Sequence, residues 1–440
     1  MEASAHSFTV WMLVAGLILL VSYGLIFSEV WHRTIAALVG AVLMVGVGMA
    51  GGFYSQEAAL RAIDANTMLL LTGMMLMVAM LRPTGGFEYL AVRIAKLAAN
   101  SPRLLLVYLA FAVSVISMFL DNVTTVIIFA PLTVLIARIL DLNPMPYLMA
   151  EAMLSNVGGI ATLVGDPPNI MIGSAGQIDF TRFLVHMGPV VTVVWVCTTA
   201  ILLVMFRREL QPSVALTGKV DLDESKAIKD PSGLVKVSLC LAGIILLFFL
   251  HHHFHLYPAY VTLLGAAVAM ALVRPDPEVV LREVEWPVLL FFAALFVIVG
   301  GVEGSGLLAL IGKQLAGYGQ DPQMLLFTAL LLMWAAAVLS AVVDNIPFTV
   351  TMIPIVLALE QHGTNITPLW WALALGVGLG GNGTHIGATA NIICVVESER
   401  CGIANACITP TIWLRKGLPT MLAGLSVASV AFAAFFEFFS

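Results

Sequence analysis

Two short polar stretches lie in the middle of long apolar segments and decide how this chain folds: Phe119-Leu120-Asp121-Asn122-Val123-Thr124-Thr125 and Asp344-Asn345-Ile346-Pro347-Phe348-Thr349. Both Asp-Asn pairs are followed by a proline at the same distance, and neither apolar segment, 103–140 or 322–360, contains a loop long enough for a surface turn. An ionised carboxylate inside such a segment costs several kcal/mol unless a cation, a proton or hydrogen bonds compensate it. The pattern predicts two re-entrant helical hairpins with acidic tips.

The composition outside these stretches is that of a membrane protein. Of 440 residues, 60% are hydrophobic and 10% are charged, whereas a soluble domain has roughly 25% charged residues. Apolar runs of about 18 residues or more, long enough to cross a bilayer, recur along the chain. The lipid bilayer is therefore the main partner, and no continuous basic surface remains for nucleic acid. The apolar run 8–27 has no small-residue cleavage site after it and is interpreted as the first span.

The chain repeats itself at a nearly fixed distance. The two Asp-Asn pairs are 223 residues apart, and a second motif, Gly-Gly-x-x-Thr-x-x-Gly-x-x-x-Asn, recurs at an offset of 222 residues. Its members are Gly158, Gly159, Thr162, Gly165 and Asn169 in one copy and Gly380, Gly381, Thr384, Gly387 and Asn391 in the other. Matching offsets indicate an internal repeat. We predict an N-terminal transmembrane repeat over 1–206, a C-terminal one over 234–440, and a hydrophilic linker over 207–233.

Charge placement predicts how the repeats face the membrane. The expected spans are 8–27, 34–52, 66–81, 147–174 and 183–206 in the first half and 234–254, 258–273, 287–302, 368–395 and 417–438 in the second. Five crossings in each half require opposite orientations, the inverted-repeat plan of many secondary transporters. With both termini periplasmic and the linker cytoplasmic, 17 of 20 basic residues lie inside and Arg61, Arg182 and Lys313 outside, as the positive-inside rule expects. The fold class is thus an all-α polytopic membrane protein of about 10 transmembrane helices plus two re-entrant hairpins.

The glycine motifs predict a break in one helix of each half. Prolines and glycines make a continuous helix improbable at these two places, and irregular backbone at membrane depth is tolerated only where it lines a cavity or is packed in protein. The expected break positions are Gly158, Gly159 and Gly165 in one half and Gly380, Gly381 and Gly387 in the other. The alternative is a close helix packing interface made by the same glycines.

The candidate substrate and ion ligands are the polar residues of these four motifs: Asp121, Asn122, Thr124, Asn169, Asp344, Asn345, Thr349, Thr384 and Asn391. The coupling candidates are Asp121, Asp344 and Asp166, whose counterpart in the second half is Ala388, so that one half has an extra titratable group. The alternatives are that each aspartate caps the following helix and that the threonines bond to their own backbone. We expect no metal site, and we interpret the histidine tract 251–255 as an interfacial loop.

In these motifs the chain resembles the ArsB/NhaD and P-permease branch of the ion transporter superfamily. The resemblance covers almost the whole sequence. It implies an inverted-repeat scaffold and a transport domain whose hairpin tips meet the broken helices near the midplane. The branch includes arsenite and antimonite efflux proteins and sodium/proton antiporters, with sodium–carboxylate symporters as more distant relatives. The matching positions here are Asp121, Asn122, Asp166, Asn169, Asp344, Asn345, Thr384 and Asn391.

The sequence therefore predicts a secondary transporter of the inner membrane and not an enzyme. Arsenite or antimonite efflux by proton-coupled antiport is the expected activity, with arsenous acid held by Asn and Thr side chains. Sodium/proton antiport is the alternative. Sodium-coupled organic anion transport is less favoured, because none of the 20 basic residues is expected at the midplane. No cofactor is expected beyond Na⁺ or H⁺ as the coupling ion, and ATP-driven transport would need a separate ATPase subunit because the chain has no P-loop.

Overall fold

The structure is a computed structural model that describes residues 9–28, 30–98, 101–211, 227–315, 322–361, 363–403 and 405–440. Within these ranges the regular structure is helical. The predicted linker falls partly outside them, since residues 212–226 are not described. Lys219 and Lys226, two of the basic residues predicted on the cytoplasmic side, therefore lie outside the described residues.

The two halves of the chain run through the same succession of helices. The first half contains α1 (Val10–Ser28), α2 (Arg33–Gly51), α3 (Gln56–Ala62), α4 (Ala65–Leu81), the short 3₁₀ helix η1 (Arg82–Thr84), α5 (Gly86–Leu97), α6 (Pro102–Ser117), α7 (Asn122–Ile139), α8 (Met145–Gly159), α9 (Pro167–Ala175) and α10 (Phe180–Met205). The second half contains α11 (Pro231–Leu250), α12 (Pro258–Val273), α13 (Pro277–Arg282), α14 (Trp286–Gly304), α15 (Leu307–Leu315), α16 (Pro322–Val342), α17 (Asn345–Glu360), α18 (Thr367–Gly380), α19 (Thr389–Arg400), α20 (Pro410–Ala434) and the terminal turn α21 (Phe436–Phe439).

Among the described residues, 9 helices are long and apolar enough to cross a membrane. They are α1, α2, α4, α7, α10, α11, α14, α16 and α20. The predicted spans 147–174 and 368–395 are not among them because each is divided into two shorter helices, and α12 is a 16-residue helix. The chain is thus an all-helical polytopic membrane protein, as predicted.

The helices form two groups that are related by the repeat. In the flanking group, α1–α4 and α11–α14, helix α2 packs on α14 of the other half, and α4 packs on α12 in the same way. In the hairpin group, α6–α10 and α16–α20, helix α6 packs on α8, α16 packs on α18, and α10 packs on α20. The two groups meet where α4 contacts α9 and α14 contacts α17.

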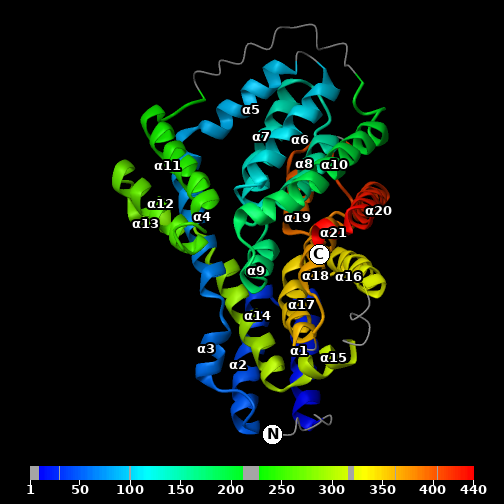
Figure 1. The fold of residues 1–440 in the computed structure, drawn as a ribbon. Helices are drawn as coiled ribbons and strands as arrows, with labels where there is room; N and C mark the ends of the chain where they lie inside the picture. The colour runs from blue at the N-terminus through cyan, green and yellow to red at the C-terminus, as the bar shows by residue number, and fades with distance from the viewer. Residues whose placement is uncertain are drawn as a thin grey trace.

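Each predicted hairpin is a pair of helices joined at its Asp-Asn pair. Helix α6 ends at Ser117 and α7 begins at Asn122, while α16 ends at Val342 and α17 begins at Asn345. Figure 1 shows α6 and α7 in the upper half of the view and α16 and α17 in the lower half, so the two hairpins approach the centre from opposite ends. The tips bring residues from both halves into one place.

Candidate functional site

The two hairpin tips use their aspartates in different ways. Asp121 is the N-cap residue of α7, where one carboxylate oxygen accepts a hydrogen bond from the backbone N–H of Thr124 at 2.8 Å and the other from the Thr124 hydroxyl at 2.6 Å. Asp344 occupies the same position before α17 but makes no capping bond with its side chain. Instead, its Oδ2 lies 3.1 Å from a guanidinium nitrogen of Arg33. Capping therefore accounts for Asp121 in part and leaves Asp344 with a partner from another helix.

The two helix breaks are held open by asparagine side chains. Helix α8 ends at Gly159 and α9 begins at Pro167, and α18 ends at Gly380 with α19 beginning at Thr389. The amide of Asn169 donates to the carbonyls of Gly159 and Thr162, both at 3.0 Å. Asn391 donates to Gly381 at 2.7 Å and to Thr384 at 2.9 Å. Carbonyls that a continuous helix would satisfy are thus satisfied by the amides.

Both glycine packing and backbone breaking occur at these motifs. A Cβ atom on Gly165 would lie 2.6 Å from the carbonyl oxygens of Gly159 and Ser117, and one on Gly387 would lie 2.8 Å from the oxygen of Gly381. The Thr162 hydroxyl bonds to the Met118 carbonyl of the neighbouring hairpin tip, and the Thr384 hydroxyl does the same to Ala341. The glycines therefore allow each broken helix to approach its hairpin tip at backbone distance.

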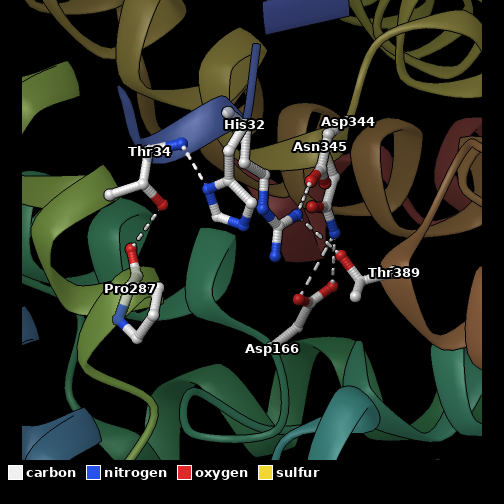
Figure 2. A network of polar contacts seen from close by, with 8 residues as sticks. His32, Thr34, Asp166, Pro287, Asp344, Asn345 and Thr389 are labelled. Atoms are coloured by element: carbon white, nitrogen blue, oxygen red, sulfur yellow. Dashed lines mark hydrogen bonds and ion pairs between the residues drawn. The ribbon is translucent and has the colours of Figure 1, made fainter. Parts of the chain in front are cut away.

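Asp166 links the halves of the chain. It is 2% exposed and stands at the N-cap position of α9 without making a capping bond. Its two carboxylate oxygens accept from the amide nitrogen of Asn345, at 3.3 and 3.1 Å. Figure 2 shows Asp166 and Asn345 pointing toward each other beside Asp344 and Thr389. The break of the first half thereby meets the hairpin tip of the second half.

A small cavity of about 30 Å³ lies between the two hairpin tips and the flanking group. Asp121, Asp166 and Asp344 line it, together with Glu285 and Arg33 from the flanking group. The Asp166 carboxylate is repelled by the carboxylates of Asp344 and Asp121. The Glu285 carboxylate is repelled by Asp121 and attracted by Arg33. A water molecule needs about 10–15 Å³ of such space, so the cavity has room for about two waters or for one bare cation.

Arg33 corrects one expectation from the sequence. No basic residue was expected at the depth of the substrate site, and Arg33 was assigned to the inner surface loop between the first two spans. In the structure Arg33 is the first residue of α2 and lines the cavity. The prediction was wrong because the sequence does not show which hairpin tip packs against the end of a span. That packing decides whether a charged residue there lies in a surface loop or at a buried site.

The cavity brings together only part of the predicted set of binding residues. Asp121, Asn122, Asp166, Asp344 and Asn345 line it. The remaining side chains bond to nearby backbone or, in one case, to an aspartate. They are Thr124, bonded to Asp121; Thr349, bonded to the Asn345 carbonyl; and Asn169, Thr384 and Asn391, which bond to backbone within the breaks or hairpin tips.

A further buried amide, Asn156, joins the hairpin group across the repeat. Its Oδ1 accepts from Asn122 at 2.9 Å, and its amide nitrogen donates to Asn382 at 2.9 Å and Asn391 at 3.2 Å. The repeat-related pair to Asn156 and Asn382 is Gly378 and Ile160, where a Cβ on the glycine would lie 2.3 Å from the isoleucine side chain. One of two equivalent places is therefore polar and the other apolar.

Glu285 and Asn156 were missed by sequence reasoning, as was the role of Arg33. A signal for Glu285 was present: it stands at the N-cap position of α14, and Asp64 stands at that of the equivalent helix α4. Only Glu285 of this matched pair lines the small cavity, because Asp64 lines a separate cavity of about 240 Å³. For Asn156 no local signal exists, because α8 is buried on every face and its sequence does not show which neighbour each polar side chain meets.

The histidines that drew notice in the sequence lie elsewhere. His251, His252 and His255 line a separate cavity of about 590 Å³ beside the turn between α11 and α12. Among the described residues, no group of three or more His, Cys, Asp or Glu side chains is arranged to hold a metal ion. The three aspartates of the small cavity do not form such a group.

Comparison with known proteins places this arrangement in a transporter context. A family model described as "Citrate transporter" (CitMHS) matches residues 23–376. A 46 kDa membrane protein of Mycobacterium leprae is 36% identical over 429 residues, covering 95% of this chain and 97% of the relative. An uncharacterized transporter of Mycobacterium tuberculosis is 37% identical over 428 residues, with coverage of 95% and 97%.

Two further comparisons extend the likeness. The human P protein is 32% identical over 494 residues, which covers 94% of this chain and 59% of that protein. The crystal structure of the Alcanivorax borkumensis YdaH transporter, whose topology is described as unusual, aligns with a TM-score of 0.61 at 16% identity, covering 98% of this chain and 99% of the other. At that identity the likeness shows a shared fold.

Proposed function

This chain belongs to the citrate transporter family, and it is a multi-pass secondary transporter and not an enzyme. We propose that it exchanges a monovalent cation for protons at Asp121, Asp166 and Asp344. The observation that carries the proposal is the charge of the small cavity. Four carboxylates line it against the single guanidinium of Arg33. Carboxylates in a membrane protein need cations or protons as partners, so a site with this excess of acid binds positive charge.

The ligand chemistry supports a small hard cation. Carboxylate, amide and backbone oxygens are the ligands that such ions prefer, and the exposed ends of broken helices add carbonyl groups near the midplane in other secondary transporters. The cavity of about 30 Å³ matches an ion that has shed most of its water. Because a proton and a cation neutralise the same carboxylates, binding of one displaces the other, which is the chemical basis of antiport.

We further propose that residues 1–206 and 234–440 are inverted-topology repeats with re-entrant hairpins, a cytoplasmic linker and periplasmic termini. The matching succession of helices and the reciprocal packing of α2 on α14 and α4 on α12 support this arrangement. In this proposal the hairpin group moves relative to the flanking group, because the site lies between them. Labelling of single cysteines at both termini in oriented vesicles tests the topology.

Cation-coupled transport of an organic anion is the second candidate. Arg33 and Thr389 face a larger cavity of about 340 Å³, which His32 also lines. A cavity of about 300 Å³ or more accommodates a small organic molecule. The sequence placed this activity third because no basic residue was expected at the site, and the position of Arg33 removes that objection.

Arsenite efflux has less support from the geometry than the sequence suggested. Binding of arsenous acid by Asn and Thr side chains requires that their amide and hydroxyl groups have no other hydrogen-bond partner. Asn169 and Asn391 donate to the carbonyls of the breaks, and Thr349 and Thr384 donate to backbone oxygens. What remains in the cavity is mainly carboxylate, which suits a cation better than a neutral trihydroxide.

Proteoliposomes containing the purified chain and a trapped pH dye test the proposal. Sodium, potassium and lithium are each added outside against choline as the inert cation, and proton efflux is recorded. We expect cation-dependent proton efflux that Asp121→Asn, Asp166→Asn and Asp344→Asn each abolish. Asparagine caps a helix about as well as aspartate does, so Asp121→Asn removes the charge and keeps the cap of α7. Asp166 and Asp344 make no capping bond that their replacement could lose.

Asp179→Asn is the matched control, because Asp179 caps α10 by accepting from the Arg182 N–H at 2.9 Å and does not line the small cavity. It should exchange like the wild type. Parallel assays add citrate, succinate or arsenite. Proton movement that needs citrate or succinate supports the second candidate, and movement that needs arsenite restores the first expectation from sequence. Cation-driven proton efflux that survives all three asparagine variants refutes the proposed site.

A further inference from the structure

Arg33 reaches the site from the flanking group and is held there by that group. The Thr34 hydroxyl, next to it in α2, donates to the Pro287 carbonyl of α14 at 2.9 Å. The Arg33 guanidinium also lies 5.5 Å from the centre of the Phe291 ring of the same helix, a favourable cation–π arrangement. Figure 2 shows His32, Thr34 and Pro287 on one side of the network and Asp166, Asp344 and Asn345 on the other.

The same guanidinium nitrogen contacts two parts of the hairpin group. It donates to Asp344 Oδ2 at 3.1 Å and to the Thr389 hydroxyl at 3.0 Å. Asp344 is at a hairpin tip, and Thr389 is the first residue of α19 after the break. One charged side chain therefore connects the hairpin tip and α19 of the second half to the flanking group.

Among the residues that the structure describes, the hairpin tip of the first half has no equivalent contact with a basic side chain. At the repeat offset of 222 residues, Arg33 corresponds to His255 in the turn before α12, and His255 lines the separate cavity of about 590 Å³ and not the small one. Asp121, the equivalent of Asp344, turns its carboxylate back to the Thr124 N–H of its own helix. The difference between the two tips shows that an aspartate in this position can cap its own helix. Asp344 does not do so, and Arg33 is its partner instead.

Arg33, Asp344 and Thr389 line both the small cavity and the larger one of about 340 Å³. The Arg33 side chain is 30% exposed and the Asp344 side chain 16% exposed. An ion pair that keeps contact with solvent is weak compared with a fully desolvated one, and a second cation can exchange with it. An ion that enters from the larger cavity meets this pair first.

We propose that Arg33 is a tethered counter-ion which competes with the transported cation for Asp344, and whose displacement frees the hairpin group from the flanking group. The inference rests on the proposed cation site and adds the residue that couples ion binding to movement. With no ion bound, Arg33 neutralises Asp344 and locks the two groups together. A cation or proton on Asp344 removes the partner of Arg33, and the lock opens.

The test measures cation-driven proton exchange in proteoliposomes as a function of cation concentration. Arg33→Gln should lower the apparent KM for the cation by up to about fivefold, the range expected for loss of a competitor held by a partly exposed ion pair. It should also release a proton leak in the absence of exchangeable cation, because the empty site is no longer locked. Arg33→Lys keeps the charge and should hold the KM and the leak nearer to the wild-type values.

Arg82→Gln is the matched control, since it breaks an arginine–carboxylate pair, with Glu283 at 3.3 Å, that lies outside the small cavity. It should change neither the KM nor the leak. An unchanged or raised KM in Arg33→Gln, with exchange still dependent on Asp344, refutes the counter-ion role and leaves the cation site standing. Absence of cation-dependent exchange in the wild type as well refutes the proposed function itself.

Discussion

The contact between α6 and α8 makes the sharpest prediction about how the site is held. Gly158 on α8 packs directly on the backbone of α6, where an added Cβ would lie 2.4 Å from the Ser114 carbonyl oxygen and 2.7 Å from its Cα. Ordinary contact begins at 3.4 Å, so Gly158→Ala requires the two helices to separate by about 1 Å. The Ser114 hydroxyl, which donates to the Leu154 carbonyl at 2.8 Å, would be strained by the same movement.

Overpacking of this kind costs about 1–3 kcal/mol, and more where backbone has to move. We therefore expect Gly158→Ala to lower the unfolding temperature of the purified protein in detergent and to reduce exchange, because α6 carries the tip with Asp121. Gly46→Ala in α2 is the matched control: it makes the same change in a helix, but no atom lies within 4 Å of the added Cβ. Its helix propensity gain of about 0.5–1 kcal/mol predicts an equal or higher unfolding temperature. Wild-type stability in Gly158→Ala would show that α6 and α8 do not approach at backbone distance.

Other buried contacts of the hairpin group lead to predictions that the same thermal unfolding assay checks. Gly380→Ala should destabilise the protein as Gly158→Ala does, because its Cβ would lie 2.4 Å from the Ala337 carbonyl oxygen. An unchanged unfolding temperature would show that α16 and α18 do not pack as closely as α6 and α8. Asn156→Ala should cost about 1–3 kcal/mol by leaving the buried amides around it without partners, and a neutral effect would mean that the amide chain is not formed. Thr133→Val should lower stability because the Thr133 hydroxyl is the hydrogen-bond partner of the fully buried Glu151, whereas Glu151→Gln keeps a polar partner and should be tolerated in stability and exchange. Equal losses of stability in Thr133→Val and Glu151→Gln would contradict this role of the Thr133 hydroxyl.

The helical class, the repeat and the positions of the breaks were predictable from the sequence. Inside a bilayer every backbone polar group needs an internal partner, so apolar runs of sufficient length become helices. The Asp121 and Asp344 pairs and the glycine motifs mark the places where that rule is interrupted. These signals are local, since a polar pair or a cluster of glycines disrupts a helix wherever the segment is finally packed.

The orientation of polar side chains around the breaks depended on packing. The sequence placed Asn169 and Asn391 among the ligands, because both follow a break and carry side-chain oxygens. In the structure each amide turns to the carbonyls of its own break. Those carbonyls come within reach only after the helix has been interrupted and folded back, which spacing alone does not describe.

The amino-acid sequence is enough to identify a helical membrane transporter with acidic hairpin tips in two equivalent positions. The inequality of the two tips appears only when the helices are packed together. Arg33 reaches Asp344, whereas the Asp121 carboxylate accepts hydrogen bonds from Thr124 of its own helix. Hydropathy and repeats report where a helix ends along the chain, whereas the partner of a charge depends on which helix end packs against it in space.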